Sequence, residues 1–214
     1  MFCSECGQRA TGKFCSRCGH PLAKEEAPAN DLPVFTGDWT QLTDYETLIR
    51  IPAVRDRLAA HAARSQKKMS GEEFLETCDK VLGSLTGGVP LTLIANLTQP
   101  ISTKLGLKTG KSRNERLAQP PGAVIVAVLS SFAERGQKLG EVTQHPNGCT
   151  LRAALPSDMW SLKGDVAIDV RTAGPTATQL EAAVTIPGQI YDWGKSTRAL
   201  NQLFTDLTTL SRAA

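Results

Sequence analysis

Two copies of a short cysteine motif near the N-terminus constrain this chain more than any other feature. Residues 3–7 read CSECG, residues 15–19 read CSRCG, and eight residues separate the inner cysteines. A Cys-x-x-Cys turn places two sulfurs on one side of the backbone, so two such turns can supply the four thiolates of a tetrahedral Zn²⁺ site. The predicted metal ligands are Cys3, Cys6, Cys15 and Cys18. Because four cysteines leave no open coordination position, we expect the zinc to be structural rather than catalytic.

A phenylalanine precedes each motif, so the phrase Phe-Cys-Ser-x-Cys-Gly occurs twice, starting at Phe2 and at Phe14. This pattern resembles the short zinc-ribbon modules that open many bacterial and archaeal proteins. The resemblance covers residues 1–23 and implies a ribbon that holds structural zinc. A segment of this length cannot bury a hydrophobic core, so we expect its fold to depend on the metal.

Cysteine usage and the N-terminal residues together indicate a reducing compartment. The N-terminus has neither the charged stretch nor the long apolar stretch of a secretory signal. The longest apolar run, Ala123–Leu129, is far shorter than the roughly 20 residues of a membrane-spanning helix. We therefore expect a cytoplasmic protein, in which clustered cysteines hold metal rather than disulfides. A redox Cys-x-x-Cys pair is the alternative, but such a pair needs no second copy.

The two remaining cysteines stand far apart from the motifs and from each other. Cys78 falls on the apolar stripe of a predicted helix, and Cys149 begins an alternating strand. Free cysteine behaves as a small hydrophobic residue in such places. We expect both thiols to be buried in the core.

Charge is nearly balanced over the whole chain but is unevenly distributed along it. The 24 Lys and Arg residues against 21 Asp and Glu residues give a net charge of +3, too little to indicate nucleic acid or anionic lipid by itself. The first 30 residues carry +1, and four thiolates with one Zn²⁺ bring the module to about −1. Ribbons that bind nucleic acid usually need a basic face, so this module is better suited to a protein partner.

The most basic segment lies between residues 104 and 117, where five cations accompany a single glutamate. We expect a loop here, and its cations are a candidate contact for an anion or for nucleic acid. The residues concerned are Lys104, Lys108, Lys111, Arg113 and Arg116. No aromatic residue is interleaved among them, so base stacking has no platform in this segment.

Composition and periodicity divide the chain into four parts. After the ribbon comes a linker rich in alanine, proline and charge, then a helical region that contains the basic loop, then a larger α+β domain. The helical region has one helix predicted after Thr43 or Asp44 and another after a capping box that begins at Ser70. The four parts are residues 1–23, 24–40, 41–118 and 119–214.

The last part predicts an antiparallel sheet with helices. A helix is expected over residues 123–135, although its valines also fit a buried strand. Four strands follow, and an amphipathic helix over residues 191–210 is expected to cover the apolar face of the sheet. The strands are expected at residues 138–144, 149–155, 164–172 and 178–186.

This order of elements is similar to part of the START-like helix-grip fold, whose sheet wraps a long final helix and often encloses an apolar cavity. The resemblance is one of architecture and involves no sequence motif. It implies an additional early strand, which the sequence pattern does not reveal. It also implies that a small apolar ligand can lie between the sheet and the last helix.

No group of side chains has the spacing of a catalytic site. His20, His61 and His145 have no acid or cysteine at a recognisable spacing, and His145 precedes an exposed Pro-Asn-Gly turn. We therefore expect a non-enzymatic protein, in which a zinc ribbon is tethered to an α+β domain and serves as an adaptor or binding module for a protein partner. The alternatives are nucleic-acid binding through the ribbon and the basic loop, and transport of a small apolar ligand in the C-terminal domain.

Overall fold

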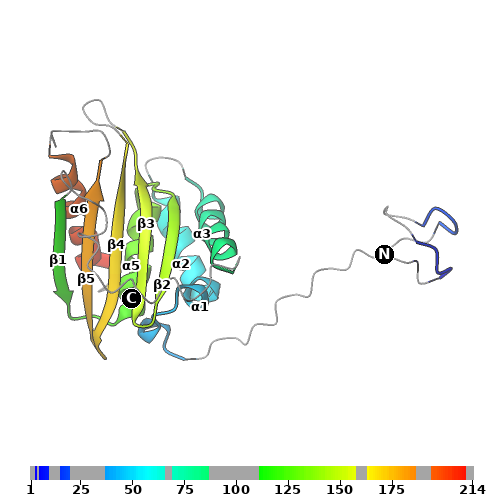
Figure 1. Cartoon of the computed structure of the whole chain (residues 1–214), viewed down its shortest axis with the longest axis horizontal. Helices are drawn as coiled ribbons and strands as arrows, with labels where there is room; N and C mark the ends of the chain where they lie inside the picture. The colour runs from blue at the N-terminus through cyan, green and yellow to red at the C-terminus, as the bar shows by residue number, and fades with distance from the viewer. Residues whose placement is uncertain are drawn as a thin grey trace. The chain divides into compact units, whose positions relative to one another are not determined.

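The chain divides into two compact units, Met1–Thr36 and Gly37–Ala214 (Figure 1). We call the described part of the first unit the metal module and the second unit the body. The computed structural model describes residues 3, 5–9, 15–19, 37–65, 69–86, 111–157, 163–186 and 194–210. Among these residues, no helix is long and apolar enough to cross a membrane.

The body contains a five-stranded antiparallel sheet with strand order β1-β5-β4-β3-β2. The first strand in sequence therefore pairs with the last, and β2 to β5 form an antiparallel meander in sequence order. The strands are β1 (Lys111–Leu117), β2 (Leu139–His145), β3 (Gly148–Leu155), β4 (Gly164–Gly174) and β5 (Ala177–Thr185). The α+β class and the four strands expected after residue 137 are confirmed, and β1 is a fifth strand that the sequence pattern did not reveal.

The prediction of a basic loop is wrong from Lys111 onward, because these residues form β1. Among the strands that the structure describes, this one lies at the edge of the sheet, with a neighbouring strand on one side only. Charged side chains are tolerated and useful on edge strands because they discourage pairing with other chains. The segment therefore lacks the apolar alternation that identifies β2 to β5. Lys104 and Lys108 lie outside the described residues.

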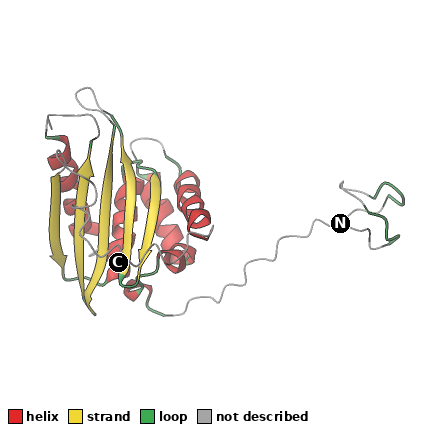
Figure 2. Ribbon diagram, viewed as in Figure 1, coloured by secondary structure: helices red, strands yellow, loops and turns green. Residues whose placement is uncertain are grey.

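The helices lie on one face of the sheet, behind it in the view of Figure 2. They are η1 (Trp39–Gln41), α1 (Tyr45–Arg50), α2 (Pro52–Ala63), α3 (Gly71–Thr86), α5 (Pro121–Glu134) and α6 (Lys195–Leu210). Asp44 caps α1 by accepting a hydrogen bond from the Thr47 N–H. Ser70 accepts one from the Glu73 N–H at the start of α3, as the capping box predicts.

Helix α5 forms the centre of the body, between the sheet on one side and α2 on the other. Every residue from Pro121 to Ala133 is buried. A helix that is apolar all round must be covered on all sides, and this explains why the valines of α5 also fit a buried strand. Pro121 occupies the first turn, where a missing N–H costs nothing.

Helix α6 packs on α5 and on the β1–β5 edge of the sheet. Its expected apolar stripe is confirmed, since Leu200, Leu203, Phe204 and Leu207 are buried. From β1, the Lys111 ammonium donates to Thr197 Oγ1 at 2.7 Å and the Arg113 guanidinium stacks 4.1 Å from the centre of the Phe204 ring. Two cations of the expected loop therefore help to hold α6 on the sheet.

The Gln144 side chain joins the first helices to the sheet. Its Oε1 accepts from the Tyr45 N–H at 3.0 Å, and its Nε2 donates to the carbonyl oxygens of Thr43 and Gly148 at 2.9 Å. The residues before and after position 118 thus share one compact unit rather than two separate ones.

Candidate metal centre

The four cysteines of the two motifs converge in the metal module. All four Sγ atoms lie within 4.8 Å of one another. The Cys3 and Cys18 sulfurs are 3.5 Å apart, as are those of Cys6 and Cys15. All four are free thiols, and the structure therefore brings together the whole ligand set that the sequence predicts.

Both halves of the site use the same backbone turn. The Gly7 N–H donates to the Cys3 carbonyl and the Gly19 N–H donates to the Cys15 carbonyl, each at 2.9 Å. The two glycines have φ of +67° and +70°, a conformation that other residues rarely adopt. The glycine after each Cys-x-x-Cys thus lets the chain turn so that both sulfurs of a motif point to one place.

The donor set and its spacing fit Zn²⁺. A Zn–S bond of about 2.3 Å places the sulfurs of a tetrahedral site about 3.8 Å apart, within the separations found here. A disulfide requires about 2.05 Å between sulfurs, so these pairs are not oxidised. Four thiolate ligands complete the coordination of a structural zinc and leave no position for substrate or water.

The protonation of the thiols depends on their backbone neighbours. Hydrogen bonds from the N–H groups of Cys18 and Arg17 lower the pKa of Cys15 to about 6. The Gln8 N–H favours the thiolate of Cys6, but desolvation and the other three sulfurs outweigh it and raise its pKa to about 12. Four thiolates this close repel one another, and a divalent cation removes that penalty.

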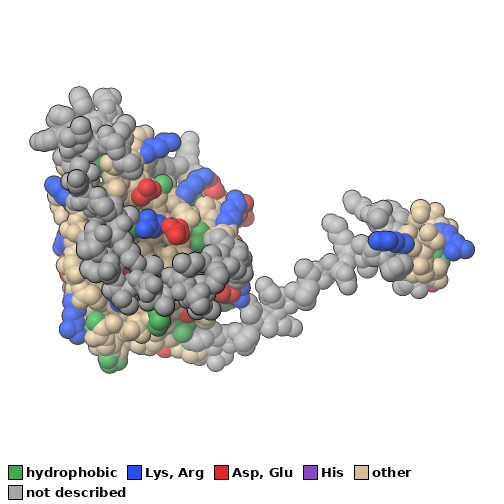
Figure 3. Space-filling model, in the orientation of Figure 1, with side chains coloured by type: hydrophobic (Ala, Val, Ile, Leu, Met, Phe, Trp, Pro, Cys, Tyr) green, Lys and Arg blue, Asp and Glu red, His purple; other side chains and the backbone are tan. Residues whose placement is uncertain are grey.

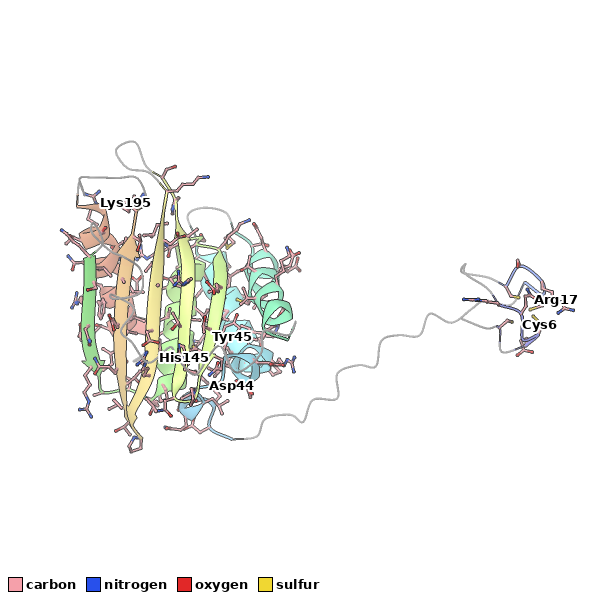
Figure 4. The ribbon with its side chains drawn as sticks, in the orientation of Figure 1. Cys6, Arg17, Asp44, Tyr45, His145 and Lys195 are labelled. Carbon is pink, nitrogen blue, oxygen red and sulfur yellow. The ribbon has the colours of Figure 1, made fainter. Side chains whose placement is uncertain are left out.

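The metal module has a small, mixed-charge surface. Cys3 and Cys15 are each 2% exposed, whereas Glu5, Arg9 and Arg17 are exposed. Figure 3 shows basic side chains on the surface of the module, and Figure 4 shows Cys6 beside Arg17. The three exposed charged residues sum to +1, so one Zn²⁺ with four thiolates leaves about −1. His20 lies outside the described residues.

Of the other basic candidates, the structure describes Lys111, Arg113 and Arg116, and each of them contacts the body. In β1, Arg113 pairs with Glu115 at 2.9 Å and, like Lys111, contacts α6. Arg116 donates to the Ala173 carbonyl at 3.2 Å. The described members of the set therefore contact the body itself.

A cluster that sequence spacing did not indicate lies on the sheet face opposite the helices. The Thr150 hydroxyl donates to Asp169 Oδ1 at 3.0 Å and therefore accepts from His145 Nε2 at 2.8 Å. Arg171 pairs with Asp169 at 2.6 Å, and burial lowers the pKa of His145. These contacts follow from strand register, which brings residues far apart in sequence into adjacent positions.

This cluster does not have the geometry of nucleophilic catalysis. A catalytic histidine accepts the proton of the nucleophile on one nitrogen and is oriented by an acid on the other. Here the Thr150 hydroxyl donates its hydrogen bond to Asp169 rather than to His145, and one nitrogen of His145, Nε2, faces both Thr150 and Asp169.

A second histidine, His61, donates from Nδ1 to Glu134 at 2.8 Å between α2 and α5.

Cys78 and Cys149 are buried as expected, each with no exposed surface. Burial raises the pKa of the Cys78 thiol to about 12 and also raises the pKa of Cys149. Both belong to the core of the body. Neither is placed to act as a nucleophile at neutral pH.

A scan against protein-family models finds no match, and a search of curated proteins finds no similar sequence. The proposed function therefore rests on the four-cysteine cluster.

Proposed function

We propose that this protein is a non-enzymatic cytoplasmic adaptor, in which a structural zinc ion orders the four-cysteine module as a zinc ribbon that binds a protein partner. The observation that carries this proposal is the convergence of four free thiols at zinc spacing. A cytoplasmic location keeps such thiols reduced and available to metal.

The surface of the metal module supports a protein partner over nucleic acid. Its described residues have charged groups of both signs, and the zinc site adds negative charge. Nucleic-acid binding depends on neutralising several phosphates, which needs an excess of exposed cations. A small surface with both positive and negative side chains, supported by one backbone turn in each Cys-x-x-Cys motif, suits a polar contact with a protein.

Two arguments support a binding role over catalysis. Four thiolates fill the coordination sphere of zinc, so the metal has no position for a reacting group. The His145, Thr150 and Asp169 contacts lack the orientation of a catalytic triad. Turnover that survives removal of zinc and is lost in a His145→Gln variant would contradict the proposal.

Affinity capture with the tagged full-length chain tests the adaptor role. The zinc-loaded chain is expected to retain a protein partner that the Cys3→Ala/Cys6→Ala variant does not retain. Cys78→Ala is the matched control, because Cys78 lies in the core of the body. An Arg17→Glu variant tests the module surface without removing a ligand, and Arg50→Glu in α1 controls for the charge change. Equal capture by all variants would contradict the role of the module.

The two alternatives from the sequence stay predictions. Nucleic-acid binding predicts an affinity that falls steeply with salt and is lost when Lys108, Lys111 and Arg113 are all changed to alanine. An apolar ligand predicts a molecule retained by protein purified from cells and detectable by native mass spectrometry.

A further inference from the structure

One edge of the sheet in the body is accessible along its whole length. Figure 1 shows β1 as the outermost strand, and among the described strands only β5 pairs with it. Five of the seven residues of β1 are exposed and none of the seven is buried. On an edge strand, every second residue directs its N–H and C=O groups away from the sheet, where a further strand can pair with them.

The opposite edge of the sheet, β2, is less accessible than β1. Helix α3 contacts β2, and the Gln144 side chain of β2 is hydrogen-bonded to the backbone of Thr43 and Tyr45. Two of the seven residues of β2 are exposed and two are buried. An added strand therefore has better access to β1.

The charges of β1 are ordered so that the strand complements a second copy of itself. In an antiparallel pair centred on Asn114, Arg113 of each copy lies opposite Glu115 of the other copy. Opposite charges at directly opposed positions stabilise a pair of antiparallel strands, and like charges destabilise it. The remaining opposed pairs, neither of which joins like charges, are Ser112 with Arg116 and Lys111 with Leu117.

Shifted registers of the same two strands oppose like charges. A shift by one residue places Arg116 opposite Lys111 or Arg113, and a shift by two residues places Arg113 or Glu115 opposite its own copy. Each shift also shortens the paired segment. A charged edge discourages pairing with most strands, but the order of these charges favours a second β1 in this one register.

The Arg113 and Glu115 side chains are positioned for this pairing. Arg113 Nη2 donates to Glu115 Oε2 at 2.9 Å, and the two side chains remain 41% and 39% exposed. Phe204 and Asn201 of α6 hold the guanidinium in place. A second copy places these four charges at the corners of a square in which neighbouring corners have opposite sign. Like charges lie only on the diagonals, which are about 7–8 Å long.

From these observations we infer that two copies of this chain associate through β1, in antiparallel register about Asn114, and form one continuous sheet across both bodies. Helix-facing residues oppose one another in this register, so the α6 helices of both copies lie on the same face of the joined sheet. Thr197 and Asn201, which accept hydrogen bonds from β1 on that face, are uncharged. The association does not depend on the zinc module or on the adaptor role.

Sedimentation velocity of the zinc-loaded full-length protein, at about 1 µM to about 1 mM, tests this association. The wild type is expected to dimerise with a Kd of about 10–100 µM, as suits a small interface made by strand addition. Arg113→Glu opposes two pairs of glutamates and Glu115→Arg opposes two pairs of arginines, so each variant is expected to dimerise at least about tenfold more weakly.

An equimolar mixture of Arg113→Glu and Glu115→Arg separates pairing between chains from pairing within a chain. In the mixed dimer, both opposed positions again join opposite charges, whereas the contact between positions 113 and 115 within each chain stays like-charged. The mixture is therefore expected to form heterodimers with an affinity in the wild-type range. A wild type that is monomeric at about 1 mM, or a mixture that associates no better than its components, would overturn the inference.

Two controls and one measurement without variants complete the test. Glu141→Arg in β2 and Arg50→Glu in α1 make the same charge changes away from β1 and are expected to keep the wild-type Kd. In the wild type, amide exchange in β1 is expected to slow as the protein concentration rises, while exchange in α1 stays constant. Exchange in β1 that is independent of concentration, or an equal loss of dimer in the control variants, would contradict pairing through this strand.

Discussion

The metal module and the body reach a defined structure by opposite means. The cysteines of the module converge on one point, and the described residues around them are mostly exposed. The body instead packs α5 between the sheet and α2, and α6 against α5 and the β1–β5 edge, with a continuous apolar core. Metal coordination replaces hydrophobic burial where the chain is too short to bury a core. The two units should therefore respond independently to metal removal and to core mutations.

The largest expected effect is the loss of zinc on removal of one ligand. Cys15→Ser is expected to lower the zinc content from about one ion per chain to near zero at micromolar metal, because structural zinc sites depend on all four ligands. Cys78→Ala is expected to keep full zinc content, since Cys78 lies in the core of the body. Atomic absorption on the purified proteins measures both, and zinc retained by Cys15→Ser would contradict the assigned ligand set.

A core substitution in the body should destabilise the body and leave the zinc content of the metal module unchanged. Phe132 in α5 is 1% exposed, and Phe132→Ala is expected to lower the free energy of unfolding by about 3–5 kcal/mol. Its zinc content should not change. Urea unfolding followed by circular dichroism, together with a zinc assay, checks this pair of outcomes. A parallel loss of zinc would show that the units are not independent.

Loss of the Gln144 contacts should lower the free energy of unfolding by less than Phe132→Ala does. Gln144→Ala leaves the Tyr45 N–H and the Thr43 carbonyl without the side-chain partner seen here, at an expected cost of about 1–3 kcal/mol in unfolding free energy. Glu141→Gln on the same strand is the control, because its side chain is 62% exposed and the expected change is within about 0.5 kcal/mol. Equal urea midpoints for the two variants would rule out the structural role of Gln144.

The smallest expected effect concerns pH. Burial lowers the pKa of His145 below its ordinary value of 6.5, so the unfolded chain binds the proton more readily than the folded chain. The body should lose stability as pH falls below 6.5, and the stability from neutral His145 is fully present above that value. A His145→Gln variant should show a shallower loss in urea unfolding over the same range. An equally steep pH dependence would locate the titrating group elsewhere.

Local patterns in the sequence predicted the parts of the molecule that depend on local geometry. Each Cys-x-x-Cys-Gly motif specifies a turn and two cysteines within five residues, so all four members of the cysteine cluster were predicted. The helix caps at Asp44 and Ser70 and the alternation of β2 to β5 are likewise local. The helical assignment of α5 is confirmed, although its all-round apolar surface obscured the helical period.

Features that depend on tertiary pairing were not predicted. β1 has the charged composition of an edge strand, and only its pairing with β5 identifies it as a strand. The His145–Thr150–Asp169 contacts require the register of three strands. The missed features therefore arise from contacts between distant segments.

Hydrogen–deuterium exchange of the full-length protein with and without a zinc chelator tests the central claim most directly. The Gly7 and Gly19 N–H groups, hydrogen-bonded to Cys3 and Cys15, should be protected only with zinc bound. Amides of α5 should exchange at the same slow rate in both samples. Protection of the Gly7 and Gly19 amides without zinc, or loss of α5 protection on chelation, would contradict the account.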